Sequence, residues 1–165
     1  MKNVIFDLDM TLVDSSIAES ARQQRNWQYV YSLIPRFVLY PGMDKVFDFI
    51  RNNGVKVAVV SSSPRPYLER VCRFFNIPSD VILGYHDCGR NKPAPDGMIR
   101  ALSEIGSSAE HTVSFGDRAV DIQASNAARI TSVACLWGSD EASVLVNSYP
   151  SLVITSPLQI IDLIK

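Results

Sequence analysis

The sequence predicts a three-layer α/β fold, with helices on both faces of a doubly wound parallel sheet. Short apolar segments alternate with longer segments of helical periodicity along the chain, and the connections between them are short. This order is typical of the fold class. The segment VKVAVV at 55–60 is rich in valine and, apart from Lys56, lacks polar alternation, which indicates a strand buried on both faces.

The expected strands are short runs of mainly apolar residues. The last of them is expected at an edge of the sheet. The expected strands are 3–6, 55–60, 81–84, 112–116, 132–138 and 151–155.

Helical segments fill the gaps between these strands. In the first, Val46, Phe47 and Ile50 share one helical face, and Gly54 provides a C-terminal stop. The third starts with a proline and stops at Gly106. The segments are 42–54, 64–78, 95–106, 119–130 and 157–165.

Residues 15–40 interrupt this order. The stretch lies between the first strand and the first regular helix, and it is polar in its middle and aromatic later. We expect one helix or a short helical hairpin, capped by Ser15 or Ser16, as an insert at the C-terminal edge of the sheet. The sequence has no repeat and no low-complexity segment, so we expect a single domain over 1–165.

Composition excludes several classes of protein. A chain of 165 residues with 47% hydrophobic and 20% charged residues is ordinary for one globular domain, and a net charge of -1 gives no global field to recruit nucleic acid. No apolar run is long enough to span a membrane, and the N-terminus turns acidic too soon for a signal peptide. The widely spaced Cys72, Cys88 and Cys135 indicate reduced thiols. We therefore expect a cytoplasmic protein without a membrane partner.

Chemically useful side chains follow four of the expected strands. Because the carboxyl ends of parallel strands meet at one edge of the sheet, where ligands bind, we expect these side chains to converge. This convergence carries more weight than any single motif. The residues are Asp7 and Asp9 after the first strand, Ser61, Ser62 and Ser63 after the second, Lys92 in the loop after the third, and Asp117 and Asp121 after the fourth.

The aspartates come in two pairs with different spacing. Asp7 and Asp9 are two residues apart, which places both carboxylates on one side of an extended chain. Adjacent like charges raise the cost of ionisation, so either a cation lies between them or one carries a proton. Asp117 and Asp121 are four apart and share a helical face. Each pair also has a structural interpretation as turn-forming or helix-start acids, and Asp14 is expected to be a helix-start acid.

The serines and the lysine likewise have two interpretations. The run at 61–63 precedes Pro64 and a helix, where hydroxyl and N–H groups either bind an anion or only cap the helix. Lys92 is either a solvated charge or, held on a rigid loop, a group that neutralises a bound phosphate and the carboxylates. Thr11 has a local interpretation as a hydrogen-bond donor to the backbone.

Taken together, DLDMTLVD, Ser61 after VAVV, Lys92 in KPAPD, and GDRAVD resemble the four motifs of the haloacid dehalogenase-like hydrolases. They occur in the family's order, each at an expected strand end, and the four together are very specific. The resemblance covers about 8–14 and 41–165 and is closest to the phosphoglycolate phosphatase-like branch. It implies a Rossmann-like parallel sheet, in agreement with the periodicity.

The resemblance also implies an activity, a Mg²⁺-dependent phosphatase that hydrolyses a phosphate monoester through an aspartyl-phosphate. Asp7 would be the nucleophile, and Asp9 the general acid for the leaving group and then the base for the attacking water. Asp7, Asp117 and the backbone carbonyl of Asp9 would hold Mg²⁺. Asp121 would support this metal site or bind the metal through water.

The same resemblance implies contacts to a phosphorylated substrate. Ser61 would bind the phosphate, with Ser62 and Thr11 beside it, and Lys92 would stabilise its charge during catalysis. The chain departs from the branch in its cap, because the segment 15–40 is too short for the usual four helices. The site should therefore be open to a macromolecular phosphate, or closed over a small one by a neighbouring subunit of a homo-oligomer.

Other hypotheses stay open at this point. A non-catalytic phospho-acceptor or binding protein on the same fold would not need Asp9 as an acid. A dehalogenase needs no metal, and Asp9 and Asp117 argue against it. A phosphatase acting on nucleic-acid ends would use basic and aromatic side chains of the insert, although we expect Trp27, Tyr31 and Ile34 to pack the insert onto the core. The side chains in question are Arg22, Arg25, Trp27, Tyr29, Tyr31 and Arg36.

Overall fold

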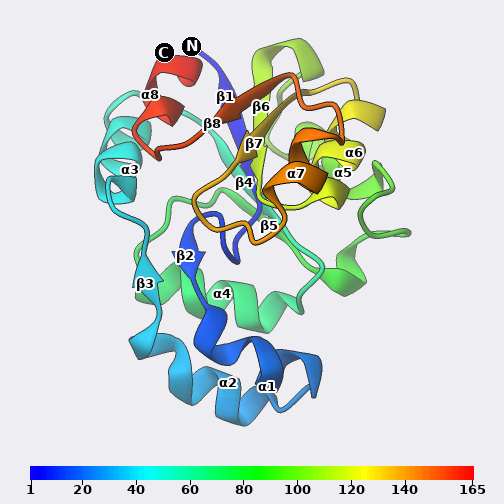
Figure 1. Cartoon of the computed structure of the whole chain (residues 1–165). Helices are drawn as coiled ribbons and strands as arrows, with labels where there is room; N and C mark the ends of the chain where they lie inside the picture. The colour runs from blue at the N-terminus through cyan, green and yellow to red at the C-terminus, as the bar shows by residue number, and fades with distance from the viewer.

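A computed structural model describes all 165 residues, and its centre is one parallel six-stranded sheet (Figure 1). The strand order is β5-β4-β1-β6-β7-β8, with every neighbouring pair parallel. The predicted α/β fold is thus confirmed, and the last strand lies at an edge as expected. The strands are β1 (Asn3–Phe6), β4 (Val57–Val60), β5 (Val81–Leu83), β6 (Thr112–Gly116), β7 (Thr131–Cys135) and β8 (Leu152–Ile154).

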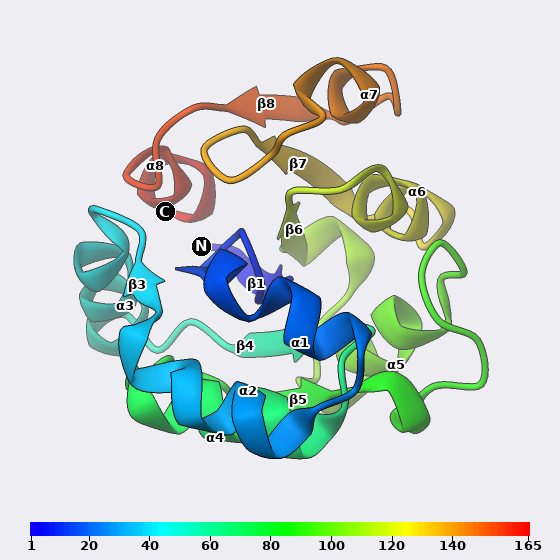
Figure 2. The ribbon, with the colours of Figure 1, turned by 60° about the horizontal axis from the view of Figure 1, so that its bottom comes forward.

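Both faces of the central strands are buried, which explains their apolar character, whereas Leu152 and Val153 of the edge strand β8 are exposed. Within β1, Val4 and Phe6 belong to one core cluster and Ile5 to another on the opposite face. Helices α3, α4 and α8 pack on the first face, and α5, α6 and α7 on the second (Figure 2). These helices are α3 (Met43–Asn52), α4 (Arg65–Phe74), α5 (Asp96–Glu104), α6 (Ala119–Ala127), α7 (Ala142–Val146) and α8 (Gln159–Ile164).

The element boundaries differ from the prediction in a few places. The second core strand begins at Val57, two residues late, and the strand expected to reach 138 ends at Cys135. Helix α7 was not predicted, because it has only five residues and buries only Leu145. None of the helices combines the length and the apolar character needed to cross a membrane.

The insert forms a short helical hairpin, one of the two predicted alternatives. Helices α1 (Glu19–Gln23) and α2 (Trp27–Leu33) are carried on a two-stranded antiparallel ribbon, β2 (Val13–Asp14) and β3 (Val38–Leu39), which the sequence did not predict. The hairpin lies at the end of the molecule opposite the two termini (Figure 1). It therefore stands at the carboxyl ends of the core strands.

Ser15 occupies the N-cap position of the first helical turn of the insert, Ser16–Ala18, but the predicted side-chain cap does not form. The hydroxyl of Ser15 donates to Asp9 and makes no capping bond, and Ser16 contributes only its backbone N–H, which donates to Asp14. Asn26 caps α2 instead, since its side chain accepts a hydrogen bond from the backbone N–H of Tyr29. A serine near a helix start caps the helix only when its hydroxyl oxygen accepts a hydrogen bond from a free backbone N–H of the first turn.

Candidate active site

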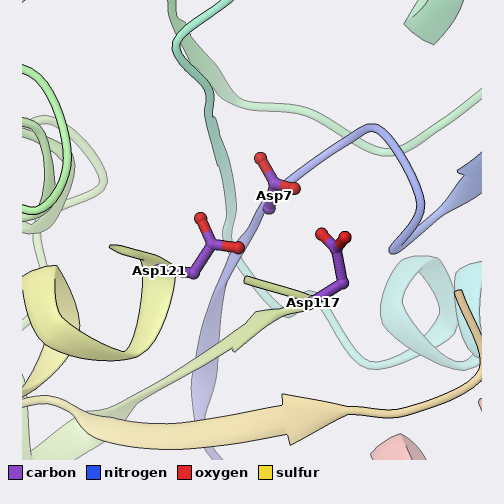
Figure 3. Close-up of side chains that lie close together, drawn as sticks. All are labelled: Asp7, Asp117 and Asp121. Atoms are coloured by element: carbon purple, nitrogen blue, oxygen red, sulfur yellow. The ribbon is translucent and has the colours of Figure 1, made fainter. Parts of the chain in front are cut away.

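Three carboxylates meet at the carboxyl ends of two adjacent core strands. Asp7 follows β1, Asp117 follows β6, and Asp121 lies in the first turn of α6; each offers an oxygen atom within 4.8 Å of the others (Figure 3). The pairing of β1 with β6 aligns the first two, since the backbone N–H of Asp7 donates to Phe115. Asp7 of the first pair and both aspartates of the second pair therefore converge, whereas the side chain of Asp9 lies outside this cluster.

Gly116 allows Asp121 to approach this cluster. A Cβ atom added at Gly116 would lie 2.4 Å from Cβ of Asp121 and 2.7 Å from its Cγ. Only a residue without a side chain leaves room for the carboxylate at this point. The glycine of the GDRAVD segment is thus required by close packing against the acid that follows it.

The cluster carries more negative charge than its protein surroundings balance. Burial, followed by the charges of Asp7 and Asp121, raises the pKa of Asp117 to about 9. Burial, followed by the charge of Asp121, raises the pKa of Asp7 to about 6, although Lys92 opposes the shift. Three carboxylates around one lysine leave a deficit of positive charge. A hard divalent cation with oxygen ligands such as Mg²⁺ fits both the donor set and this deficit.

Lys92 lies inside the cluster and is not a solvated surface charge. Its side chain is 5% exposed, and its Nζ donates to Asp121 Oδ1 at 2.8 Å, to Asp7 Oδ1 at 3.3 Å and to the carbonyl of Val60 at 2.6 Å. Burial opposes its charge, but Asp121 and Asp7 outweigh that effect and raise the pKa of Lys92 above its usual range. The lysine therefore stays charged beside Asp7.

Asp9 faces a different set of partners. Its Oδ1 accepts hydrogen bonds from Ser15 Oγ and Tyr67 Oη, both at 2.6 Å, and its Oδ2 pairs with Arg22 Nη1 at 3.2 Å. Burial and the charge of Asp9 raise the pKa of Tyr67 above its usual range, so the phenol keeps its proton and donates it. The Asp9 side chain is not one of the three clustered carboxylates.

Arg22 and Tyr67 were missed as partners of Asp9 by the sequence analysis. Tyr67 lies in the first turn of α4, after the serine run, and Arg22 lies in α1 of the insert. The only available signal for Tyr67 was its place near a strand end. No signal in the sequence pointed to Arg22, because its ion pair with Asp9 depends on how the insert folds back.

The serine run lines the same site. Ser61 is buried, and its Oγ accepts a hydrogen bond from the backbone N–H of Ser63 at 3.1 Å, while Ser62 is exposed. Helix α4 begins directly after this loop, and Pro64 provides no side-chain cap. The exposed hydroxyl of Ser62 is therefore open to an anion, whereas Pro64 and Pro66 have no N–H and the N–H groups of Tyr67 and Leu68 donate to the carbonyl of Pro64.

Thr11 departs from its expected place. The residue is fully buried, and its Oγ1 donates to Asp117 Oδ1 at 3.0 Å. Its carbonyl accepts a hydrogen bond from Trp137 Nε1 at 2.9 Å, which anchors the loop. Thr11 does not line the cavity. The structure thus gives it a contact to the carboxylate cluster in place of the substrate contact that we expected.

An open cavity of about 930 Å³ connects these groups, and few of its lining residues are hydrophobic. Asp7, Asp9, Lys92, Asp117 and Asp121 lie on it together with the serine run. Residues of the insert form one wall of this cavity. These residues are Ser16, Glu19, Arg22, Gln23, Arg25 and Trp27.

The aromatic residues of the insert are used mainly within the chain. The Trp27 ring centroid lies 5.6 Å from that of Tyr67, and the Arg70 guanidinium lies 4.1 Å from the centre of the Tyr31 ring. Ile34 is buried in the core. The packing interpretation of these side chains is confirmed. Of Trp27, Tyr29 and Tyr31, only Tyr29, with 54% exposure, points to solvent. Closure of the site by a lid shared with a neighbouring subunit, and thus a homo-oligomer, stays a prediction.

Comparisons with known proteins identify the family of this chain. A family model for haloacid dehalogenase-like hydrolases matches residues 19–129. A candidate pyrophosphatase PpaX of Caldanaerobacter subterraneus is 30% identical over 118 residues, which cover 70% of this chain and 54% of the relative. A phosphoglycolate phosphatase of Pseudomonas syringae is 26% identical over 155 residues, which cover 90% of this chain and 55% of the relative. The chain therefore spans about half the length of these curated relatives.

Solved structures share the fold at low identity. A HAD-superfamily hydrolase of subfamily IA from Geobacter sulfurreducens superposes with a TM-score of 0.81 at 19% identity, covering 99% of both chains. A hydrolase from Pseudomonas syringae gives a TM-score of 0.84 at 19% identity, covering 98% of this chain and 97% of the other. With the family model matching most of the sequence, this chain belongs to the haloacid dehalogenase-like hydrolases.

Proposed function

We propose that the chain is a Mg²⁺-dependent phosphatase that hydrolyses a phosphate monoester through an aspartyl-phosphate on Asp7. One observation carries the proposal: three buried carboxylates and a buried lysine meet at the base of a polar cavity, with a fourth acid two residues after the first. The relatives named as phosphatases agree in reaction class.

The residues of the cluster would divide the work of binding. Asp7, Asp117 and Asp121 would hold Mg²⁺, with the carbonyl of Asp9 as a further ligand, and the bound ion would offset the repulsion between the carboxylate and the phosphate. Lys92 would add a fixed positive charge next to Asp7. Thr11, on this geometry, would orient Asp117 through its hydrogen bond.

The phosphate itself would lie between the cluster and the serine loop. The hydroxyl groups of Ser61 and Ser62 offer donors to its oxygens. The carboxylate of Asp7 must stay ionised to act as a nucleophile, and Lys92 favours that form.

The chemistry would proceed in two displacements at phosphorus. In the first, Asp7 forms a bond to phosphorus, the bond from phosphorus to the leaving oxygen breaks, and Asp9 gives that oxygen a proton. In the second, water attacks phosphorus, the bond to Asp7 breaks, and the proton lost by the water goes to Asp9. The sum converts ester and water to alcohol and inorganic phosphate, with both aspartates restored.

Phosphate release from 4-nitrophenyl phosphate in the presence of Mg²⁺ tests this proposal. Asp7→Asn is nearly isosteric, so it should abolish release and leave the fold intact, whereas Asp48→Asn on the exposed face of α3 should release phosphate as the wild type does. Retained turnover in Asp7→Asn would refute the nucleophile. Full activity of the wild type in chelator would refute the metal dependence and favour a dehalogenase-type, metal-free mechanism.

The substrate is addressed by a panel of esters. The names of the relatives suggest phosphoglycolate and inorganic pyrophosphate, and the open cavity suggests terminal phosphates on DNA and RNA. A wild-type protein that accumulates phosphorylated Asp7 and releases no phosphate from any of these compounds would instead support the phospho-acceptor hypothesis.

A further inference from the structure

The carboxylate of Asp9 is held by donors on both of its oxygens. Ser15 and Tyr67 donate to Oδ1 at 2.6 Å each, and Arg22 pairs with Oδ2 at 3.2 Å. Ser15 and Arg22 belong to the insert, and Tyr67 belongs to α4 of the core. The orientation of this side chain therefore depends on two parts of the molecule that meet only in the folded structure.

Tyr67 is fixed by the insert. The residue is fully buried, and the insert surrounds its ring, with ring centroids of Trp27 at 5.6 Å and Phe37 at 6.4 Å. The guanidinium carbon of Arg22 lies 5.9 Å from the centre of the same ring. The phenol oxygen on Asp9 cannot shift without moving this packed cluster.

Arg22 is held in the same place. Its side chain is 18% exposed, and its Nε is buried without a hydrogen-bond partner. The ion pair with Asp9 and the contact with the Tyr67 ring are thus the interactions that offset its burial. An arginine that served only to solubilise the cavity wall would instead extend into water.

We propose that Arg22 and Tyr67 are positioning residues for Asp9, so that the insert orients the carboxylate that transfers the proton as well as covering the site. The inference rests on the proposed function, in which Asp9 protonates the leaving oxygen. Proton transfer requires heavy atoms about 2.6–3.2 Å apart, and a misplacement of about 1 Å lowers a rate by roughly 10²-fold. A short loop side chain does not reach that precision without fixed partners.

Leaving groups of different acidity separate positioning from general damage to the protein. An alkyl phosphate has a poor leaving group that needs the proton of Asp9 when its bond to phosphorus breaks. The leaving group of 4-nitrophenyl phosphate departs as a stable anion and does not need it. The kcat/KM value reports on this first step for both esters, whereas hydrolysis of the aspartyl-phosphate is common to both and limits kcat only.

Tyr67→Phe keeps the packed ring and removes only the hydroxyl. We expect its kcat/KM to fall by roughly 10²-fold for glycerol 2-phosphate and to change by less than about threefold for 4-nitrophenyl phosphate. With 4-nitrophenyl phosphate, kcat should fall, because Asp9 is still needed to activate the water that hydrolyses the aspartyl-phosphate. KM should fall with it, because kcat/KM stays nearly unchanged. Tyr31→Phe is the matched control, since that ring packs against Arg70 and makes no contact with Asp9.

Arg22→Gln and Arg22→Lys test the second positioning residue without depending on the core. Arg22→Gln should show the same selective loss, and Arg22→Lys should recover part of it, because a lysine restores the charge without the planar fork. Equal losses for the two esters in Tyr67→Phe and Arg22→Gln, or no loss in either variant, would overturn the inference while leaving the phosphatase proposal standing. A wild-type protein that hydrolyses neither ester with Mg²⁺ would overturn both.

Discussion

Raising the pH should destabilise the metal-free protein, because the carboxylate cluster holds protons that the unfolded chain has lost. The folded-state pKa values of Asp117, about 9, and Asp7, about 6, both lie above their ordinary value of 3.8. Between pH 3.8 and these folded-state pKa values, the folded state binds more protons than the unfolded state. The free energy of unfolding therefore falls as pH rises. The stability that these retained protons contribute is fully present below pH 3.8, and it is lost as the pH rises through the folded-state pKa values.

The size of the effect follows from the number of protons. One carboxyl group that is protonated only in the folded state lowers the free energy of unfolding by about 1.4 kcal/mol per pH unit. A proton that the coupled pair of Asp117 and Asp7 retains from pH 5 to pH 8 corresponds to a loss of about 4 kcal/mol over these three pH units. Both side chains are largely buried, so solvent screens them little. Against a typical domain stability of about 5–15 kcal/mol, the loss is large.

Urea unfolding at a series of pH values in chelator measures this loss directly. Asp117→Asn removes the group with the larger shift, so its unfolding free energy should depend less on pH and should exceed that of the wild type at pH 8. Excess Mg²⁺ should stabilise the wild type most at high pH, where the ligands are ionised, and should stabilise the variant less. Asp48→Asn, at a side chain with 71% exposure, should keep the wild-type slope.

The result that refutes this reasoning is a free energy of unfolding that stays flat or rises from pH 5 to pH 8 in chelator. A variant Asp117→Asn that is less stable than the wild type in chelator at pH 8 would refute it as well. The window avoids pH values above 8, because burial raises the pKa of the cysteine thiols Cys72, Cys88 and Cys135 and their unfolded forms ionise there.

Three further substitutions test the packing around the site. Thr11→Val removes the hydroxyl on Asp117 and keeps the volume, so the affinity for Mg²⁺ measured by calorimetry should fall by about 10–100-fold; unchanged affinity would show that the hydrogen bond does not orient the ligand. Gly116→Ala forces a Cβ against Asp121 and should lower the free energy of unfolding by about 1–3 kcal/mol, together with Mg²⁺ affinity; a fully stable variant would contradict the close packing. Trp27→Ala should lower stability by about 2–3 kcal/mol at every protein concentration, because the ring packs within the chain; a dependence on concentration would favour the shared lid.

Local patterns predicted the core elements well and the short ones poorly. Short, mainly apolar runs identified every strand of the main sheet. The central strands are buried on both faces and need no polar alternation. The ribbon of β2 and β3 escaped, since each strand has two residues and the pairing of Val13 with Leu39 spans the whole insert. Helix α7 escaped because its exposed Val144 and Val146 obscure the single buried position, Leu145.

The candidate site was predictable to the extent that it depends on strand ends. Parallel strands bring their carboxyl ends to one edge, so the positions of Asp7, Lys92 and Asp117 in the chain were enough to expect them together. The direction in which each side chain points could not be predicted from its position in the chain. Thr11 was expected at the substrate and lies behind Asp117, because the loop anchored by Trp137 turns its hydroxyl inward.

The sequence by itself determined the order of elements, the fold class and the segments that carry the chemistry, because these depend on local hydrophobic periodicity and on the order of segments along the chain. Only the tertiary structure decided the partners of Asp9. Arg22 and Tyr67 stand 13 and 58 positions from it, and no local spacing encodes such a contact. Packing of the insert around one buried tyrosine ring brings the three side chains together, and that packing is a property of the whole fold.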